Sequence, residues 1–249
     1  MRSQSRIEEI FGSSFLIGNS TFIDESTSIF GKVTIGNNCF IGKYVVIGYP
    51  NLETIKEYAK SETQGKNKPV YDAETVIGNN VIIQPGAIIY GGAKIGNRVT
   101  IGPSVTVGKG TTIGDDTQLM YGSQIHENAT IGKNCRIGGF ICDCARIGDN
   151  VSVFGSLVHE YIDGWDDEVD LTDCSPIIED NVIIAFNSLI VGKVRVKSRT
   201  FVKPKAVVKS DTPGDCIVIP PSTAIKLEDW KGKLKDGKFF NEKVINAAF

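Results

Sequence analysis

Aliphatic residues recur at every sixth position along most of this 249-residue chain, and this spacing constrains its fold more than any other feature. A helix repeats about every 3.6 residues and a simple strand every two, so neither produces a period of six. The residue two places before each aliphatic is nearly always Ser, Thr, Ala, Val or Cys. The aliphatic series begins at Ile17, Ile23, Ile29, Ile35, Ile41 and Ile47, resumes from Ile77 to Ile137, steps to Ile141, Ile147 and Val153, and returns from Ile178 to Val208.

This period predicts an all-β fold, a parallel β-solenoid with three short strands in each coil of 18 residues. Successive coils would hydrogen-bond edge to edge about 4.8 Å apart, so the aliphatic side chains would stack along three inner corners. Glycine often follows the aliphatic residue. We interpret it as the residue of corners whose backbone needs unusual dihedral angles.

Two segments interrupt the repeat and lead us to divide the chain. Residues 49–74 are polar and partly helical in character, and residues 160–175 are acidic. We predict a lead-in at residues 1–12, one solenoid domain at 13–219 carrying both inserted loops, and a C-terminal extension at 220–249. In that extension Asp236-Gly237 indicates a hairpin turn. Long loops on a compact scaffold are usually functional or disordered, so both loops are candidates for a site.

Composition narrows the possible partners. The formal net charge of -2 gives no basic field for nucleic acid. We expect no membrane span, because no apolar run approaches the necessary length, and the polar N-terminus favours a cytoplasmic location. The six cysteines are interpreted as buried or incidental thiols. No metal site is expected, because the pair Cys142 and Cys144 has no second Cys/His pair at finger spacing.

The chain has only two histidines, and both fall beside the third inner corner. His126 follows Ile125 in the place where glycine often stands, and counting by eighteen from Ile141 puts His159 at the corner itself. The first inserted loop leaves just after a third-corner residue too. We therefore expect both histidines and both loops on one edge of the solenoid, with the histidines roughly 10 Å apart. Such an edge could transfer protons near neutral pH, although a plain surface histidine is the alternative.

The segments "VTIGNNCFIGKYVVIG" and "AKIGNRVTIGPSVTVGKGTTIG" resemble the hexapeptide-repeat acyltransferases, closest in character to the sugar, nucleotide-sugar and xenobiotic-type acetyltransferases. The resemblance implies a left-handed parallel β-helix and a homotrimer that binds the acyl donor between neighbouring subunits. It implies acetyl-CoA as donor, or an acyl carrier protein in its place. A histidine of such enzymes acts as general base on the hydroxyl or amine of the acceptor.

The same resemblance suggests roles for particular residues. The segment "GSLVHEYIDGW…DCSPIIEDNVIIAFNSLIVG" is similar to the family pattern in which the catalytic histidine precedes a protruding loop, although Glu179 and Ala185 stand where glycine is common. It implies His159 as the base. His126 is second, because "IHEN" lacks the spacer residue of other members. Glu160 or Asp163 would orient the imidazole.

Further residues are expected to bind ligands. "VVIGYP" before the first loop is similar to the loop that nucleotide-sugar acyltransferases raise over the acceptor, and we assign substrate binding to Tyr49, Asp163 and Trp165. The basic stretch from residue 193 to 209 would suit the phosphates of CoA, although ordinary solvated faces would look the same. The donor-binding residues predicted there are Lys193, Lys197, Arg199, Lys203 and Lys205.

The sequence thus predicts an acetyl-CoA-dependent acyltransferase acting on a small acceptor, a sugar or nucleotide-sugar. The alternative is a non-catalytic β-helix that serves as a scaffold or assembly subunit, which would bind no CoA. A γ-class carbonic anhydrase would share the fold but needs three histidines for its zinc, and this chain has two.

Overall fold

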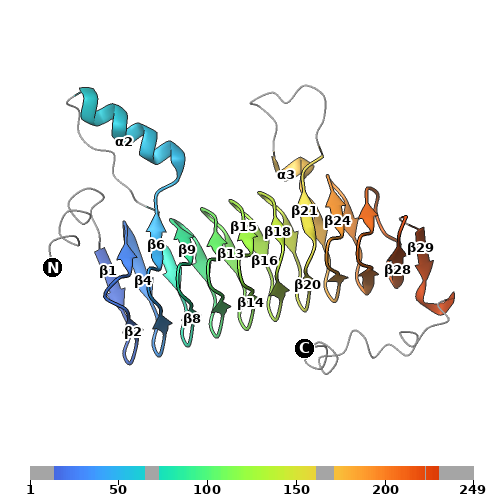
Figure 1. Cartoon of the computed structure of the whole chain (residues 1–249), viewed down its shortest axis with the longest axis horizontal. Helices are drawn as coiled ribbons and strands as arrows, with labels where there is room; N and C mark the ends of the chain where they lie inside the picture. The colour runs from blue at the N-terminus through green and yellow to red at the C-terminus, as the bar shows by residue number, and fades with distance from the viewer. Residues whose placement is uncertain (1–13, 65–72, 161–170, 222, 230–249) are drawn as a thin grey trace. The chain divides into compact units, whose positions relative to one another are not determined.

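The computed structural model describes residues 14–64, 73–160, 171–221 and 223–229. The chain divides into two compact units, residues 1–129 and 130–249. In both units short parallel strands form three sheets (Figure 1). The predicted three-sided β-solenoid is therefore confirmed, whereas a single domain over residues 13–219 stays a prediction.

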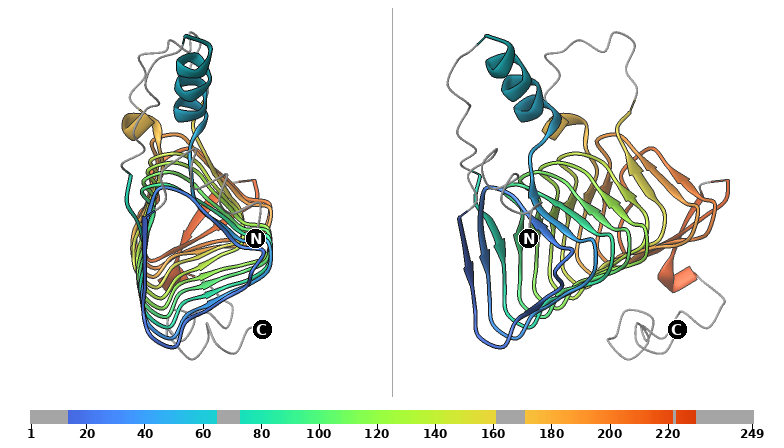
Figure 2. Two further views of the ribbon diagram at one scale, coloured as in Figure 1. Left: turned by 90° about the vertical axis from the view of Figure 1, so that its left-hand side faces the viewer. Right: turned by 60° about the vertical axis from the view of Figure 1, so that its left-hand side comes forward.

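In the first unit each coil contributes one strand to each sheet, and the coils form triangles (Figure 2, blue to green). The first sheet contains β1 (Ser14–Ile17), β4 (Lys32–Ile35), β7 (Thr75–Ile77), β10 (Lys94–Ile95) and β13 (Thr112–Ile113). The second contains β2 (Phe22–Ile23), β5 (Phe40–Ile41), β8 (Ile82–Ile83), β11 (Thr100–Ile101) and β14 (Gln118–Leu119). The third contains β3 (Ser28–Ile29), β6 (Val46–Tyr49), β9 (Ile88–Tyr90), β12 (Thr106–Val107) and β15 (Gln124–Ile125).

The core of this unit is the stack of aliphatic residues that the period predicted. Ile17 pairs with Ile35, and Ile35 with Ile77, so the coils return in register across the first insertion. Ile35 is 2% exposed, whereas Ile17 in the first coil is 43% exposed, because the described residues cover that coil on one side only. The small residues between the corners, such as Ala87 and Val99, are fully buried.

Glycine follows the corner residue for a different reason from the one we expected. A Cβ at Gly36 would lie 2.6 Å from the carbonyl oxygen of Gly78, and one at Gly78 would lie 2.7 Å from Gly96. These glycines do not have positive φ angles; those occur two residues later, as at Asn38 and Asn80. Glycine is needed there because successive coils approach closely, and asparagine takes the left-handed position, which it tolerates.

A ladder of side-chain hydrogen bonds joins the coils at the corner between the first two sheets. The Oδ1 atom of Asn37 accepts from the backbone N–H of Asn19 at 2.7 Å, and that of Asn79 accepts from Asn37 at 2.8 Å. Asn97 and Asp115 continue the series. Each coil therefore satisfies a backbone donor of the coil before it.

The first insertion contains helix α2 (Leu52–Gln64), which projects from the end of β6 at the third sheet (Figures 1 and 2). Its departure just after the third corner is confirmed, as is the helical character of the segment. The pKa of Glu74, where the chain returns to the coil, is lowered by hydrogen bonds from Lys32 and Thr34.

The second unit continues the same plan. Its first sheet contains β16 (Thr130–Ile131), β19 (Arg146–Ile147), β22 (Ile177–Ile178) and β25 (Arg195–Val196). Its second contains β17 (Arg136–Ile137), β20 (Ser152–Val153), β23 (Ile183–Ile184), β26 (Thr200–Val202), β28 (Cys216–Ile219) and β29 (Thr223–Lys226). Its third contains β18 (Phe140–Ile141), β21 (Ser156–Val158), β24 (Leu189–Val191) and β27 (Val207–Val208).

The coil between Ile141 and the next third-corner residue is shorter than we predicted. Ile141 pairs with Leu157, which is fully buried and in turn pairs with Ile190. The prediction that His159 occupies the inner corner is therefore wrong, and His159 lies two residues after the corner. The short step from Ile137 to Ile141 simply recurs in the following coil.

The second insertion contains the short helix α3 (Leu171–Cys174), and the last parallel strand, β28, ends at Ile219. There β29 turns back to pair antiparallel with β28, followed by the 3₁₀ turn η1 (Leu227–Asp229). The hairpin predicted at Asp236-Gly237 lies outside the described residues. No helix in the described part of the chain is long and apolar enough to cross a membrane.

Candidate functional site

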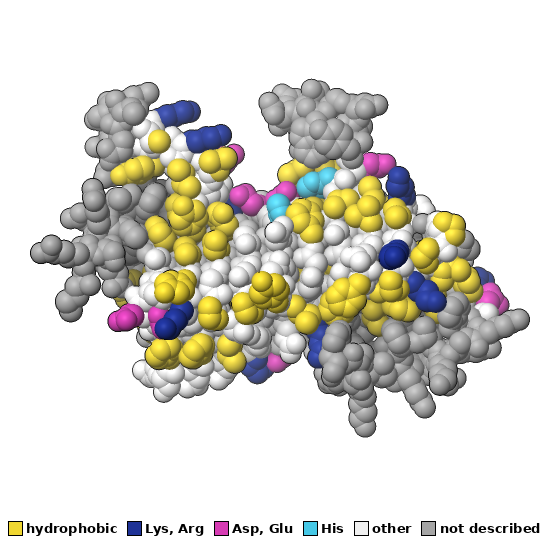
Figure 3. Space-filling model, in the orientation of Figure 1, with side chains coloured by type: hydrophobic (Ala, Val, Ile, Leu, Met, Phe, Trp, Pro, Cys, Tyr) yellow, Lys and Arg dark blue, Asp and Glu magenta, His cyan; other side chains and the backbone are white. Residues whose placement is uncertain are grey.

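His126 lies just after β15 in the third sheet of the first unit, as the period predicted. Its side chain is half-buried, and both histidines of the chain are visible at the surface (Figure 3). The backbone here is held tightly: Thr111 Oγ1 donates to His126 O at 2.8 Å. A Cβ at Gly108, one coil earlier, would lie only 2.5 Å from the carbonyl carbon of His126. Glycine at position 108 therefore allows the backbone of His126 to pack this closely against the preceding coil.

His126 lines a pocket of about 260 Å³ on this sheet. Thr106, Gly108 and the inner-corner residue Ile125 also line it. The remaining lining residues, mostly polar, are Asn51, Leu52, Tyr90, Gln124 and Glu127. The pocket thus brings together a histidine, a carboxylate and two side-chain amides, one of which lies in the first insertion.

Asn51 fixes how helix α2 begins beside the pocket. Its Oδ1 atom accepts hydrogen bonds from the backbone N–H of Thr54 at 3.2 Å and from Thr54 Oγ1 at 2.9 Å. The backbone N–H of Ile55 donates to Asn51 O. This is an N-cap, which asparagine favours because its side chain satisfies a donor that the helix leaves open.

Tyr49, predicted to bind substrate, sits in β6 between two other rings. Its ring packs edge-on against Phe30 at 5.2 Å and against Tyr90 at 5.7 Å between centroids. Tyr90 lines the pocket, so Tyr49 supports a pocket wall. Direct contact of Tyr49 with substrate stays a prediction.

His159 follows β21 in the second unit, where its ring meets the second insertion. The Nε2 atom lies 3.1 Å from the carbonyl oxygen of Asp143 and 3.1 Å from Ser175 Oγ. Ser175 is 1% exposed, and its hydroxyl, which has one hydrogen to donate, faces two carbonyl acceptors, Asp143 O at 2.7 Å and Leu171 O. A carbonyl oxygen only accepts, so Nε2 bears the hydrogen when this imidazole donates to it, and the lone pair of the neutral ring is then on Nδ1.

The thiol of Cys142, next to Asp143 in the chain, is not suited to act as a nucleophile beside His159. Burial, and then the charge of Asp143, raise the pKa of the Cys142 thiol to about 12, so the thiol stays protonated. Glu160, predicted to orient the imidazole, lies against Gly192, where a Cβ would come within 2.7 Å of Glu160 Cβ. Its orienting role stays a prediction.

Two other predictions stay untested. One concerns residues outside the described part of the chain, and the other concerns a distance between residues of different units. Asp163 and Trp165 lie outside the described residues. His126 and His159 belong to different units, and the expected distance of about 10 Å between them stays a prediction. What the structure does bring together is His126 with the start of the first insertion, and His159 with the end of the second.

The basic stretch is mostly solvated. Lys193, Lys197 and Lys205 are exposed and Lys203 is half-buried, whereas Arg199 forms an ion pair with Asp215. Arg195, in the same stretch, pairs with Glu179 at 3.2 Å, so part of the positive charge is neutralised within the fold. The predicted binding of CoA phosphates by these five residues stays a prediction.

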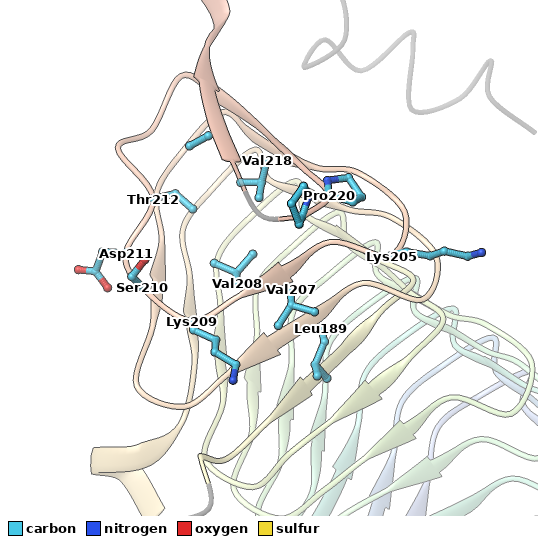
Figure 4. A pocket seen from close by; sticks show the side chains of 12 residues that line it. Leu189, Lys205, Val207, Val208, Lys209, Ser210, Asp211, Thr212, Val218 and Pro220 are labelled. Carbon is cyan, nitrogen blue, oxygen red and sulfur yellow. The ribbon is translucent and has the colours of Figure 1, made fainter.

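Lys205 lines a second, larger pocket of about 810 Å³ in the last coils of the second unit. Val207, Val208, Val218 and Pro220 turn toward one another there, while Lys205 and Asp211 point away from them (Figure 4). The pocket therefore has an apolar interior and a charged rim. In the part of the chain that the structure describes, no cluster of three or more His, Cys, Asp or Glu could hold a metal ion.

Sequence reasoning missed Asn51, Tyr90 and Glu127 at the first pocket. Only Asn51 left a signal, because asparagine before a polar segment of helical character is a typical N-cap. Tyr90 and Glu127 look like any outward residue of the repeat. At the second histidine it missed Ser175, whose role depends on how the insertion returns to the coil.

Comparison with known proteins confirms the resemblance to hexapeptide-repeat transferases. Residues 74–109 and 110–140 match the family described as bacterial transferase hexapeptide (six repeats). A search of curated protein sequences finds no match.

Solved structures with a similar arrangement include three acyltransferases. A UDP-N-acetylglucosamine acyltransferase from Francisella novicida is 19% identical, with 82% of this chain and 67% of that chain covered and a TM-score of 0.38. The enzyme of the same name from Arabidopsis is 16% identical, with 91% and 80% covered and a TM-score of 0.45. A serine acetyltransferase from Neisseria gonorrhoeae is 23% identical, with 54% and 43% covered and a TM-score of 0.30. Likeness at this level carries no information on the substrate of this chain.

Proposed function

We propose that this protein is an acyltransferase that moves an acetyl or other short acyl group from a thioester to a hydroxyl or amine of a small acceptor. One observation carries the proposal: His126 lines a pocket beside an inserted helix, on a solenoid whose repeats match a transferase family. A histidine in a pocket with polar walls is the group that general-base catalysis requires.

His126 acts as the base in this reaction. Its imidazole takes the proton from the acceptor hydroxyl or amine, and the acceptor oxygen or nitrogen attacks the thioester carbonyl carbon. The tetrahedral intermediate collapses as the carbon–sulfur bond breaks, and the leaving thiolate takes the proton from the imidazolium. No metal or redox partner is needed for this balance.

The acceptor is a sugar or nucleotide-sugar. The pocket offers amide groups from Asn51 and Gln124, a carboxylate from Glu127 and a tyrosine, a mixture that suits a ligand bearing several hydroxyls. A volume of about 260 Å³ is small, which favours one sugar ring in the pocket and any nucleotide outside it.

Acetyl-CoA is the donor, with an acyl carrier protein as the other thioester source. The exposed lysines of the basic stretch support a donor that carries phosphates, and Lys205 and Lys209 stand at the rim of the larger pocket. We propose a homotrimer on the basis of the family resemblance, since such a trimer would bring a donor bound between subunits to the base.

His159 is the second candidate for the base, and a non-catalytic scaffold is the alternative function. His159 lies beside an insertion as the resemblance requires, but its Nε2 atom is within hydrogen-bonding distance of a buried serine and a backbone carbonyl. That environment favours a role in attaching the second insertion to the coil.

The test combines binding and turnover. Acetyl-CoA is titrated into the wild-type protein by calorimetry, and release of free CoA thiol is then followed with a panel of amino sugars and UDP-sugars. We expect saturable donor binding, thiol release that depends on one acceptor, and loss of that release in His126→Ala. Thiol release that His159→Ala abolishes and His126→Ala spares would transfer the role to His159. The absence of both donor binding and thiol release, with acetyl-CoA and with an acyl carrier protein, would favour the scaffold.

A further inference from the structure

Asn51 presents a polar group that the fold does not use. The residue is 4% exposed, although it stands where the chain leaves the solenoid for helix α2. Its Oδ1 atom faces Thr54 N, and because that backbone N–H can only donate, the oxygen of the amide must be the atom on this side. The Nδ2 group therefore points away from the first turn of the helix.

The Nδ2 group has no hydrogen-bond partner among the described residues. Asn51 also lines the pocket that contains His126. A buried N–H donor is normally satisfied, by protein, water or ligand, because leaving it unpaired is costly. Nδ2 is not among the fully buried side-chain atoms without a partner, so it reaches solvent, and a ligand in the pocket that Asn51 lines can take the place of that water.

Capping the helix does not by itself explain why the residue is asparagine. Aspartate and serine cap helices about as well, threonine somewhat less well, and each would provide the oxygen that Thr54 uses. What asparagine adds is a pair of N–H donors on the opposite side of the same rigid group.

We propose that Asn51 determines acceptor specificity in the His126 pocket, by donating from Nδ2 to an oxygen of the bound sugar while its Oδ1 caps helix α2. The proposal rests on the proposed function for the nature of the ligand. The sugar oxygen that accepts is a ring, hydroxyl or amide oxygen adjoining the group that His126 deprotonates. One side chain thereby ties acceptor binding to the position of the inserted helix.

The decisive variant is Asn51→Asp, which keeps the capping oxygen and replaces the donor with an acceptor. Asn51→Thr is the uncharged counterpart, with a capping hydroxyl and no amide. Asn37→Asp is the matched control for charge, because Asn37 is exposed, lies in the same unit and also uses its Oδ1 to accept from a backbone N–H. Thr54→Val removes a capping partner of Oδ1 and leaves Nδ2 in place.

Binding of UDP-glucose, UDP-galactose and UDP-N-acetylglucosamine to each full-length variant is measured by calorimetry, with far-ultraviolet circular dichroism and thermal unfolding on the same samples. We expect the dissociation constant of the UDP-sugar that the wild type binds best to rise roughly five- to tenfold in Asn51→Asp and Asn51→Thr. The Asn37→Asp and Thr54→Val variants should bind like the wild type.

Three results would overturn the proposal: no binding of any of the sugars by the wild type, unchanged binding in both Asn51 variants, or an equal loss of binding in Thr54→Val. The last would mean that Asn51 acts only through the helix cap. Sugar binding that depends on Asn51, together with no thiol release from any donor, would contradict the acyltransferase function and leave the assignment of Asn51 intact.

Discussion

The two histidines stand in comparable places and are held in different ways. Each follows a strand of a third sheet, and each lies beside an inserted segment that contains a helix. His126 lines a pocket whose walls are side chains able to bind a ligand, whereas His159 directs Nε2 at a backbone carbonyl and a buried serine.

The two histidines differ because of the residue at which the first insertion leaves the coil and the residue at which the second insertion returns to it. Near the start of the first insertion, Asn51 lines one pocket together with His126 and residues of the sheet. The second ends with Ser175, whose hydroxyl enters the space beside the imidazole. The topological position of a histidine is therefore a poor guide to its role, and the residues that flank the insertion decide it.

The largest expected effect separates the two histidines by activity. His126→Ala should lower kcat/KM by roughly 10²- to 10⁴-fold, because it removes the general base. His159→Ala should mainly lower thermal stability, because the Asp143 carbonyl loses a donor. Thiol-release kinetics and thermal unfolding are measured on both variants. Loss of activity in His159→Ala, with only a loss of stability in His126→Ala, would exchange the roles of the two histidines.

Gly108→Ala tests how tightly the His126 backbone is held. The added methyl group would lie 2.5 Å from the His126 carbonyl carbon, so the coil must shift, at a cost of about 1–3 kcal/mol in the free energy of unfolding. Activity should fall with it. Denaturant unfolding measures the first effect. Gly122→Asn is the control, because nothing lies within 4 Å of a Cβ there and asparagine tolerates its positive φ.

Ser175→Ala tests whether the second insertion is anchored through the His159 group. Removing the hydroxyl takes a donor from the Asp143 carbonyl, which should cost about 1 kcal/mol and leave kcat/KM unchanged. Thermal unfolding is compared with that of Ser210→Ala, an exposed serine of the same unit. A loss of activity larger than the loss of stability would show that His159 belongs to the catalytic machinery.

The smallest effect concerns Glu179, in the coil after the second insertion. The hydrogen bond from the backbone N–H of Ser198 lowers the pKa of this carboxyl most. Burial opposes it by less, and Arg195 lowers the pKa further, so it lies below its ordinary value. A carboxyl with a lowered pKa stabilises the fold above that ordinary value, near 4.5, and loses this contribution as the pH falls. The wild type should therefore exceed Glu179→Gln by a few tenths of a kcal/mol, about 0.3, at pH 7 and lose the advantage toward pH 3. Urea unfolding across this range measures it, and an advantage that grows with acid would contradict the assignment.

Much of the fold could be predicted from the sequence because the solenoid repeats one local rule. Buried positions such as Ile35 and Val99 recur with a fixed spacing, and each needs only a small or aliphatic side chain. The shortened coil escaped this rule. The sequence feature that accompanies the shortened coil is the pair Gly139 and Gly155. A Cβ on Gly139 would overlap the carbonyl oxygen of Gly155.

The candidate site was less accessible to sequence reasoning. The position of His126 followed from the period, but the pocket did not, because it depends on how helix α2 leaves the sheet at Asn51. The predicted rank of His159 above His126 came from a resemblance to a histidine-then-loop pattern. Nothing in that pattern reveals that Ser175 returns to the imidazole.

The first coil that the structure describes has one neighbouring coil among the described residues, and this has a consequence for local opening. In a solenoid each coil is stabilised by its immediate neighbours, so a coil with one neighbour opens at lower free energy than an internal one. Ile17 is exposed to 43%, and amide hydrogens of β1 should exchange with solvent faster than those of β4 and β7. Three coils, those of β6, β9 and β12, lie between β3 and β15 along the third sheet. Fraying that starts at β1 would have to pass through each of them before it reached His126, so the pocket is insulated from that end of the chain.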